Sequence, residues 1–404
     1  MHPSRRQPIH TVYGGAHLFK ADTAARLGAT ALKALETHAP DAATLAAALG
    51  MSEEAAARLH PRLREKLTRE PVEDFRLDFE DGYGNRPDAE EDGHAQSAAA
   101  EVAAGARNGT LPPFVGIRIK NLGDELRDRA LRTAHLFIER LLQDTGGALP
   151  PNFVVTLPKI TATSQVAALA STFDRLEASH HLAPGSLRME LMVETPYSIF
   201  DEHGAVALPR LVREGHGRVA AAHFGTYDYT ASLGITAAHQ HMRHPACDFA
   251  RSVMQVALAG TDIALSDGAT NVLPVGADRA VVHRAWKAHF DDIQHSLVNG
   301  FYQGCDLHPA QLVTRYAAVY AFFFASLDAA SARLRNFIAR AAQATLVGEV
   351  FDDAATGQGL LNFFLRALNC GAVREDEIGT LTGLTLDELR SASFVKIVQG
   401  RRAS

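Results

Sequence analysis

The chain has 404 residues, of which 47% are hydrophobic and 21% are charged. This composition is that of a globular protein with a sizeable core, so small disulfide-held, fibrous and wholly disordered classes are excluded. Forty Lys and Arg stand against 46 Asp and Glu, which gives a net charge of -6, and no stretch concentrates basic residues. We therefore expect no nucleic acid among its partners.

The three cysteines, Cys247, Cys305 and Cys370, are far apart and lack Cys-x-x-Cys spacing. They argue against a disulfide framework and favour a reducing compartment. The basic N-terminus is not followed by an apolar segment of signal-peptide length. The longest apolar run, 317–327, is shorter than the ~20 residues that a membrane-spanning helix needs. The sequence predicts a cytoplasmic protein without a membrane partner.

Strand-like apolar runs recur along the chain, with amphipathic, helix-like stretches between them. Eight such runs begin, in chain order, at His10, Asp74, Phe114, Asn152, Leu187, Val219, Thr261 and Phe301. Clear helical stretches between them are 124–143, 163–178 and 278–297. Strands that alternate with helices pair in parallel, so eight such units predict an α/β fold, the (β/α)8 TIM barrel.

Two stretches exceed one strand-helix unit and predict additions to the barrel. Residues 39–70 have the pattern of two or three short helices and follow the first strand. Residues 346–404 follow a barrel that we expect to span 1–345, and they include a capping-box pattern from Thr385. We expect the first stretch to be a helical insertion and the second a C-terminal helical extension.

Charged side chains alternate with apolar ones along the predicted strands, and this alternation places them on one face. The side chains predicted to point into the barrel are Asp78, Glu80, Arg118, Lys120, Glu190, Met192 and Glu194. They stand near the carboxyl ends of their strands, where barrel active sites are built. Carboxylates beside an Arg can hold a hard cation and an acidic substrate. The alternative is that buried ion pairs merely fill the barrel.

Seven short motifs follow one another from the first strands to the last. They are LDFEDGYG from Leu77, RIK from Arg118, TLPKI from Thr156, VETP from Val193, FGTYDYTASLG from Phe224, LSDG from Leu265 and GFYQGCDLHPAQ from Gly300. In this order they resemble the motifs of the HpcH/HpaI aldolase and citrate lyase β-subunit superfamily. Each motif alone is weak, and their common order makes the resemblance specific.

This resemblance implies a divalent metal ion, magnesium or manganese. In the family the ion is held by the Glu that closes the fifth strand and the Asp that closes the sixth, and these match Glu194 and Asp228 here. Two protein carboxylates, with water and substrate oxygens completing an octahedron, are also what magnesium prefers.

The resemblance also assigns substrate-binding residues. Arg118 matches the Arg that contacts substrate oxygens, and the backbone amides around Tyr227 and Asp228 would receive the substrate carboxylate. The turn at Gly225 and Thr226 permits close approach. The task shared by the family is to stabilise an enolate, so the implied substrate is a small oxoacid or an acyl-CoA.

One position departs from the pyruvate aldolase branch of the family. There the motif after the second strand is Asp-x-Glu-His, and the His serves the acid/base step, whereas this sequence has Asp78-Phe79-Glu80-Asp81. Asp81 is typical of the citrate lyase and malyl-CoA lyase branch. An Asp needs burial or a like-charged neighbour to exchange protons near neutral pH, and Glu80 is such a neighbour. We expect the Glu80 and Asp81 pair to be catalytic through water, with His308 as the alternative.

The resulting prediction is an enzyme, a metal-dependent carbon-carbon lyase or aldolase that acts through a metal-stabilised enolate. A phosphoenolpyruvate-type phosphoryl or acyl transferase is the alternative, because one barrel hosts many reactions. A non-catalytic, metabolite-binding barrel is a third reading, disfavoured by the retention of Glu194, Asp228 and Arg118. Family members assemble, so we expect a homo-oligomer, a trimer or hexamer, with the apolar run from Gly359 as a candidate interface.

Overall fold

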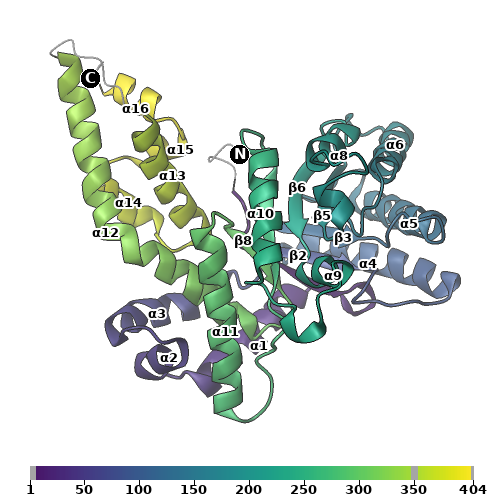
Figure 1. The fold of residues 1–404 in the computed structure, drawn as a ribbon, viewed down its shortest axis with the longest axis horizontal. Coiled ribbons are helices and arrows are strands. Elements are labelled where there is room, and N and C mark those ends of the chain that lie inside the picture. The colour runs from purple at the N-terminus through teal and green to yellow at the C-terminus, as the bar shows by residue number, and fades with distance from the viewer. Residues whose placement is uncertain (1–5, 347–353, 402–404) are drawn as a thin grey trace.

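The computed structural model describes residues 6–346 and 354–401, and its centre is a closed barrel of eight parallel strands (Figure 1). Each strand pairs with the next in the chain, and the last pairs with the first. The strands are β1 (His10–Gly15), β2 (Asp74–Asp78), β3 (Phe114–Arg118), β4 (Val154–Leu157), β5 (Arg188–Val193), β6 (Val219–Phe224), β7 (Ala264–Ala269) and β8 (Gln303–Asp306). Each predicted apolar run contains one of them, which confirms the TIM barrel.

Helices surround the barrel and extend it at the C-terminus (Figure 1). They are α1 (Thr23–His38), α2 (Ala42–Leu49), α3 (Glu53–Arg69), α4 (Asp88–Asn108), α5 (Arg127–Thr145), α6 (Thr163–Ser179), α7 (Pro196–Ile199), α8 (Leu208–Glu214), α9 (Thr226–Ser232), α10 (Pro245–Leu258), α11 (Arg279–Val298), α12 (Gln311–Leu346), α13 (Ala354–Cys370), α14 (Ile378–Thr382), α15 (Leu386–Arg390) and α16 (Phe394–Gly400). Short 3-10 turns are η1 (Ala16–Leu18), η2 (Ala237–His239) and η3 (Glu375–Glu377).

A buried ion-pair network fills the N-terminal half of the barrel interior. Arg76 on β2 is 1% exposed and donates from Nη2 to Glu190 Oε1 on β5 at 2.7 Å. It also donates to Asp74 and to the Thr156 hydroxyl at 3.1 Å. Such pairing is needed because an unpaired charge is costly to remove from water. In this part of the barrel the inward-pointing charges form buried ion pairs with one another. Glu190 is therefore a residue of the core.

Residues 39–70 contain the predicted helical insertion. Helix α2 begins where the Asp41 carboxylate accepts a hydrogen bond from the Thr44 amide at 2.7 Å, and it ends at Gly50, whose φ of 68° suits glycine. The Ser52 hydroxyl caps α3 in the same way. Helix α2 packs on α11 and α3 packs on α12, so the insertion lies outside the barrel.

Helix α12 has 36 residues, so it closes the barrel and continues beyond it (Figure 1). On its distal part, Phe323 meets Phe363 of α13 with 5.2 Å between ring centroids, and Phe337 meets Phe394 of α16 at 5.6 Å. The capping box predicted from Thr385 starts α15. The C-terminal helical extension is thus confirmed, while the domain boundary at 345/346 stays a prediction.

The helical insertion and the C-terminal extension touch each other. Arg62 on α3 donates to the Ala372 carbonyl at 2.9 Å and to the Glu377 carboxylate. These contacts hold the extension against α3.

The apolar run from Gly359 lies in α13 and packs within its own chain. Leu361 and Phe364 are fully buried, and α13 packs on α12 and α16. This helix therefore covers its own chain, and the homo-oligomer stays a prediction.

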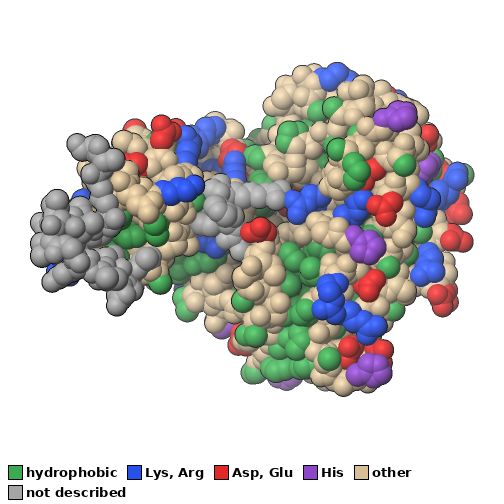
Figure 2. Space-filling view, turned by 90° about the horizontal axis from the view of Figure 1, so that it is seen from above, with side chains coloured by type: hydrophobic (Ala, Val, Ile, Leu, Met, Phe, Trp, Pro, Cys, Tyr) green, Lys and Arg blue, Asp and Glu red, His purple; other side chains and the backbone are tan. Residues whose placement is uncertain are grey.

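The surface shows mixed charge. Figure 2 shows acidic and basic side chains interspersed over the visible face, with apolar side chains between them. One helical segment of the described residues, 311–340 in α12, is long and apolar enough to cross a membrane, but half of its apolar window is buried inside the protein. A core helix has the same character, so this segment is weak support for a membrane span.

Candidate active site

Arg118 closes β3 and lies beside Asp78 of β2 in the barrel register. Its Nε and Nη2 donate to the Asp78 carboxylate at 2.8 and 2.6 Å. The same carboxylate accepts from the backbone amides of Glu80 and Gly82 at 3.0 and 2.7 Å. The guanidinium is therefore fixed in orientation, and its Nη1 stays 3.5 Å from Glu80 and 3.7 Å from Asp81.

The ring of Tyr13 on β1 packs against the Arg118 guanidinium. The Arg118 guanidinium carbon lies 4.7 Å from the centre of the Tyr13 ring, within the range of a cation-π contact. The Tyr13 hydroxyl lies 3.8 Å from Met192 Sδ on β5. Sequence reasoning missed this residue, although its alternation with the buried Val12 is a signal for an inward direction.

Glu80 and Asp81 follow β2 and share the ammonium of Lys159, which follows β4. Nζ donates to Glu80 and to Asp81 Oδ1 at 2.8 Å. Burial raises the pKa of Glu80. Burial also disfavours charge on Asp81, but the hydrogen bond from Lys159 and the other lowering effects, which include the charges of Arg118 and Lys159, together outweigh it and lower the pKa of Asp81. His308, the alternative, uses Nδ1 to accept a hydrogen bond from the Ala310 amide at 3.1 Å. The structure brings the predicted pair together, and its catalytic role stays a prediction.

Lys159 lies at the centre of this acidic cluster, although the predicted site did not include it. Its Nζ is 3.9 Å from Asp228 Oδ2. Burial favours the neutral amine, but the hydrogen bonds that the ammonium donates to Asp81 and Glu80, together with their negative charges, outweigh this effect and raise the pKa of Lys159 above its usual value. A usable signal exists in the sequence, because Leu-Pro-Lys follows the fourth strand as the other charged residues follow theirs.

Glu194 and Asp228 follow the neighbouring strands β5 and β6, as predicted for metal ligands. Glu194 is 2% exposed and accepts a hydrogen bond from the Lys159 amide at 2.7 Å, while the Asp228 side chain is 45% exposed. Burial, and then the charge of Asp228, raise the pKa of Glu194 to about 7. A bound cation would relieve both effects, so this pair has the character of a cation site.

The donor set fits magnesium or manganese better than a metal that needs many protein ligands. Across residues 6–346 and 354–401, no three His, Cys, Asp or Glu side chains form a cluster that could hold a metal. Glu194 and Asp228 would therefore be two carboxylate ligands without a third of these types. Magnesium keeps several waters and takes one or two protein carboxylates.

Because Gly225 has no side chain, the Glu194 side chain can pack directly against its backbone. A Cβ at position 225 would lie 2.5 Å from Glu194 Oε2 and 2.6 Å from Glu194 Cβ, closer than real Cβ atoms approach. The φ of Gly225 is -109°, which any residue can adopt, so the restriction is one of space. The Gly225 amide also donates to the Val193 carbonyl at 3.0 Å. This close packing fixes Glu194 against the segment that leads to Asp228.

Thr226 and Tyr227 open helix α9, and other residues engage their side chains. The Thr226 hydroxyl lies 3.0 Å from Met242 Sδ, and the Tyr227 hydroxyl accepts a hydrogen bond from the Asn271 amide at 2.9 Å. The first amides of a helix have no partner within that helix, which leaves backbone donors for the carboxylate binding predicted here. That binding stays a prediction.

The prediction that Lys120 points into the barrel is wrong. Its ammonium donates to the Phe79 carbonyl at 2.8 Å and to Glu91 on α4 at 2.7 Å, so it lies against the helix layer. Strand β3 ends at Arg118, and strand alternation no longer applies two residues later.

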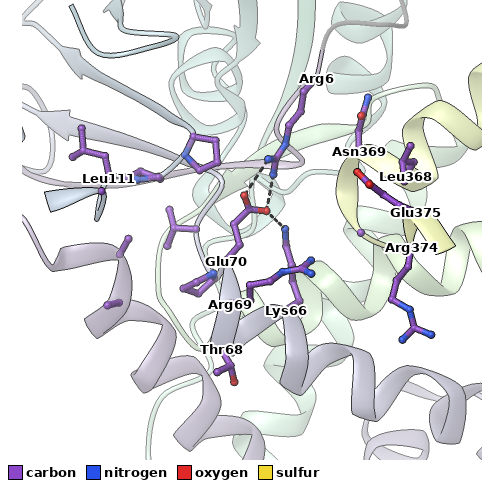
Figure 3. A pocket seen from close by; sticks show the side chains of 18 of the residues that line it. Arg6, Lys66, Thr68, Arg69, Glu70, Leu111, Leu368, Asn369, Arg374 and Glu375 are labelled. Atoms are coloured by element: carbon purple, nitrogen blue, oxygen red, sulfur yellow. Dashed lines mark hydrogen bonds and ion pairs between the residues drawn. The ribbon is translucent and has the colours of Figure 1, made fainter. Parts of the chain in front are cut away.

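A pocket of about 1020 Å³ lies at the other, N-terminal end of the barrel (Figure 3). The end of α3, the loop at 109–113 and the segment from Leu368 line it. Inside it, Arg6 and Lys66 converge on Glu70 (Figure 3). Arg6 and Lys66 are both engaged in ion pairs with Glu70 and Glu73. We place the candidate active site at the opposite end, where the charged residues that follow the strands lie together.

A family model described as "Domain of unknown function (DUF6986)" matches residues 2–397. None of the curated proteins matches the sequence.

Solved structures share the architecture. A citrate lyase from Burkholderia xenovorans LB400 has a TM-score of 0.59 at 18% identity, covering 94% of this chain and 99% of that chain. The malate synthase of Haloferax volcanii, in a magnesium and glyoxylate complex, has a TM-score of 0.47 at 16% identity, covering 78% of this chain and 76% of its own. The protein CitE of Mycobacterium tuberculosis, with magnesium and acetate, has a TM-score of 0.46 at 14% identity, covering 79% and 93%. The likeness to the citrate lyase shows that this chain shares its TIM-barrel fold, which is the fold that the motif resemblance implies.

Proposed function

The chain belongs to the DUF6986 family, and we propose that it is a metal-dependent carbon-carbon lyase or aldolase acting on a small oxoacid or its coenzyme A thioester. One observation carries this proposal. The paired carboxylates of Glu194 and Asp228 lie at the same end of the barrel as the oriented guanidinium of Arg118. Such a pair suits a divalent cation, and the guanidinium suits substrate oxygens that become negative.

A magnesium or manganese ion held by Glu194 and Asp228 would stabilise negative charge on a substrate oxygen by several kcal/mol. Arg118 would add a charge-assisted hydrogen bond worth roughly 1.5 to 3 kcal/mol. Asp78 holds the guanidinium plane before substrate arrives, so little ordering is left for the binding step. The first amides of α9, around Tyr227, would receive the substrate carboxylate.

Carbon-carbon cleavage needs a base, because a hydroxyl proton leaves as the bond breaks. The electrons of that bond move into the oxoacid or thioester fragment as an enolate, and the hydroxyl carbon becomes a carbonyl. The Glu80 and Asp81 carboxylates would take the proton through a water molecule and return it to the enolate carbon. Their shared Lys159 ammonium keeps this pair on the Arg118 side of the site.

Enolate formation is tested by exchange of pyruvate methyl protons in D2O, followed by proton NMR with magnesium or manganese present. Oxaloacetate cleavage and acetyl-CoA exchange are run in parallel. We expect metal-dependent exchange or cleavage of at least one of the three, abolished by a chelator and by Glu194→Gln. A metal-loaded, folded protein that is inert towards all three would contradict the proposal.

A further inference from the structure

Lys159 contacts both halves of the acidic cluster through different atoms. Its backbone amide donates to Glu194 Oε1 at 2.7 Å. Its ammonium donates to Glu80 and to Asp81 at 2.8 Å. One residue thus holds a carboxylate after β5 with its main chain and two carboxylates after β2 with its side chain.

The backbone of Lys159 is strained in a way that serves these contacts. Its φ is 49°, in the left-handed region that residues other than Gly, Asn and Asp rarely adopt. Such conformations persist where the surrounding structure holds them, and they gather at functional sites. In this conformation the amide bonds to Glu194 while the side chain extends to the loop after β2.

The cluster contains more carboxylates than a magnesium site with open positions needs. Glu80, Asp81, Glu194 and Asp228 all lie close to Lys159 or bond to it. With Lys159 in place, no three acidic side chains of the described residues form a metal cluster, but the Lys159 ammonium lies between Glu80 and Asp228. Without this ammonium, Glu80 and Asp81 would be free to turn to the cation and to fill coordination positions that substrate oxygens require. A fixed ammonium on two of them removes both as ligands.

We propose that Lys159 is a positioning residue that divides these four carboxylates into two pairs. Its ammonium holds Glu80 and Asp81 for substrate and proton handling, and its amide holds Glu194, which with Asp228 is left for the cation. The inference rests on the proposed function for the identity of the metal site.

The test is calorimetric titration with Mg²⁺ alone, without substrate. Lys159→Asn removes the ammonium but keeps a residue that tolerates φ above zero. We expect it to bind Mg²⁺ at least about tenfold more tightly than wild type, a change of ~1.4 kcal/mol. Lys159→Arg keeps the charge and should stay close to wild type. Lys287→Asn removes a lysine charge that pairs with Asp291 on the outer helix α11, and this matched control should change nothing.

A second substitution identifies the carboxylate that becomes free when the Lys159 ammonium is removed. Glu80→Gln should leave wild-type Mg²⁺ affinity nearly unchanged, but combined with Lys159→Asn it should return the affinity towards the wild-type value. Lys159→Gly, which tolerates the backbone still better, repeats the measurement if the Asn variant melts early.

The outcomes separate this inference from the proposed function. Wild type that binds Mg²⁺, with Lys159→Asn and Lys159→Gly variants that are folded and bind equally or more weakly, overturns the role of Lys159 alone. Wild type that does not bind Mg²⁺ or Mn²⁺ overturns the metal site and, with it, the inference.

Discussion

The guanidinium of Arg118 and the carboxylate of Asp78 form a two-point ion pair between residues that are register partners on neighbouring strands. This ion pair fixes the orientation of the planar guanidinium group. An ammonium at the same position is a point charge and cannot meet two oxygens in this way.

Replacing Arg118 by Lys should therefore lower oxoacid turnover about ten- to a hundredfold, since a charge-assisted bond of roughly 1.5 to 3 kcal/mol is lost at 1.36 kcal/mol per decade. Oxoacid affinity and turnover are measured beside Mg²⁺ affinity and melting temperature. Asp78→Asn is a comparison variant, because it keeps the guanidinium but weakens the ion pair that orients it. Unchanged oxoacid handling in Arg118→Lys would reject the substrate role.

Glu194→Gln and Asp228→Asn should each weaken Mg²⁺ binding by about a hundredfold or more, because each removes one of two charged ligands at ~1.4 kcal/mol per decade. Isothermal calorimetry measures this directly. Asp291→Asn, on the outer face of α11, removes an equal charge and should leave the affinity unchanged. If both site variants bind Mg²⁺ as tightly as wild type does, the assignment of Glu194 and Asp228 as metal ligands is wrong.

Gly225→Ala replaces no metal ligand but should still weaken Mg²⁺ binding, because the new methyl group would lie 2.5 Å from Glu194 Oε2 and displace that carboxylate. The expected loss is about tenfold, with a lower melting temperature from overpacking of roughly 1 to 3 kcal/mol. Gly359→Ala in α13 is the matched control, since nothing beyond its chain neighbours and the nearby backbone of its own helix lies within 4 Å of its added Cβ, and Ala is the better helix former. Equal Mg²⁺ affinity in Gly225→Ala and wild type would contradict the steric role.

Asp81→Asn keeps the shape of the acid pair and removes one titrating group. We expect turnover to fall by about 10²- to 10⁴-fold, the usual contribution of general acid-base catalysis, together with a changed pH profile. Melting temperature serves as the folding control. If rate and pH profile stay as in wild type, Asp81 has no such role and His308 is the next residue to replace.

Glu70 links stability to pH in the pocket far from the site. Burial opposes its charge, but the hydrogen bonds from Arg6 and Lys66 prevail and lower its pKa from 4.5 to about 2. A lowered folded-state pKa contributes stability above about pH 4.5, and this is lost as the pH falls towards 2. With solvent screening, the contribution is on the order of 1 kcal/mol.

Glu70→Gln should therefore lower the free energy of unfolding in urea at pH 7 by about 1 kcal/mol, and the gap to wild type should shrink between pH 4.5 and 3. Glu65→Gln on α3 is the control, because the Glu65 side chain is half exposed and its ion pair with Arg69, at 3.6 Å, is long and exposed to solvent. A gap that is constant across this pH range would exclude the linkage.

Local patterns predict the barrel and the charged strand ends because both depend on residues that are near in sequence. Each strand is a short apolar run, and alternation within β2 and β3 suffices to direct Asp78 and Arg118 inward. The same rule fails at Lys120, because the strand has ended and Glu91 of α4 binds the ammonium.

The sequence places Lys159 after the fourth strand, but its conformation and contacts could not be predicted in this way. Its left-handed φ and its contacts with Glu80 and Glu194 join three loops that meet only once the barrel has closed. Such a position depends on tertiary structure, and no hydrophobic period marks it.

Helix α12 makes barrel closure and the C-terminal helices parts of one mechanical unit. The Ala310 carbonyl at its start accepts a hydrogen bond from Trp286 of α11 at 2.9 Å, while Arg335 further along donates to the Thr380 carbonyl at 2.9 Å. Local opening follows cooperative units. Local unfolding of the C-terminal helices would therefore also destabilise α12, which packs on β8. Amide hydrogen exchange in the C-terminal helices and in β8 should then rise together.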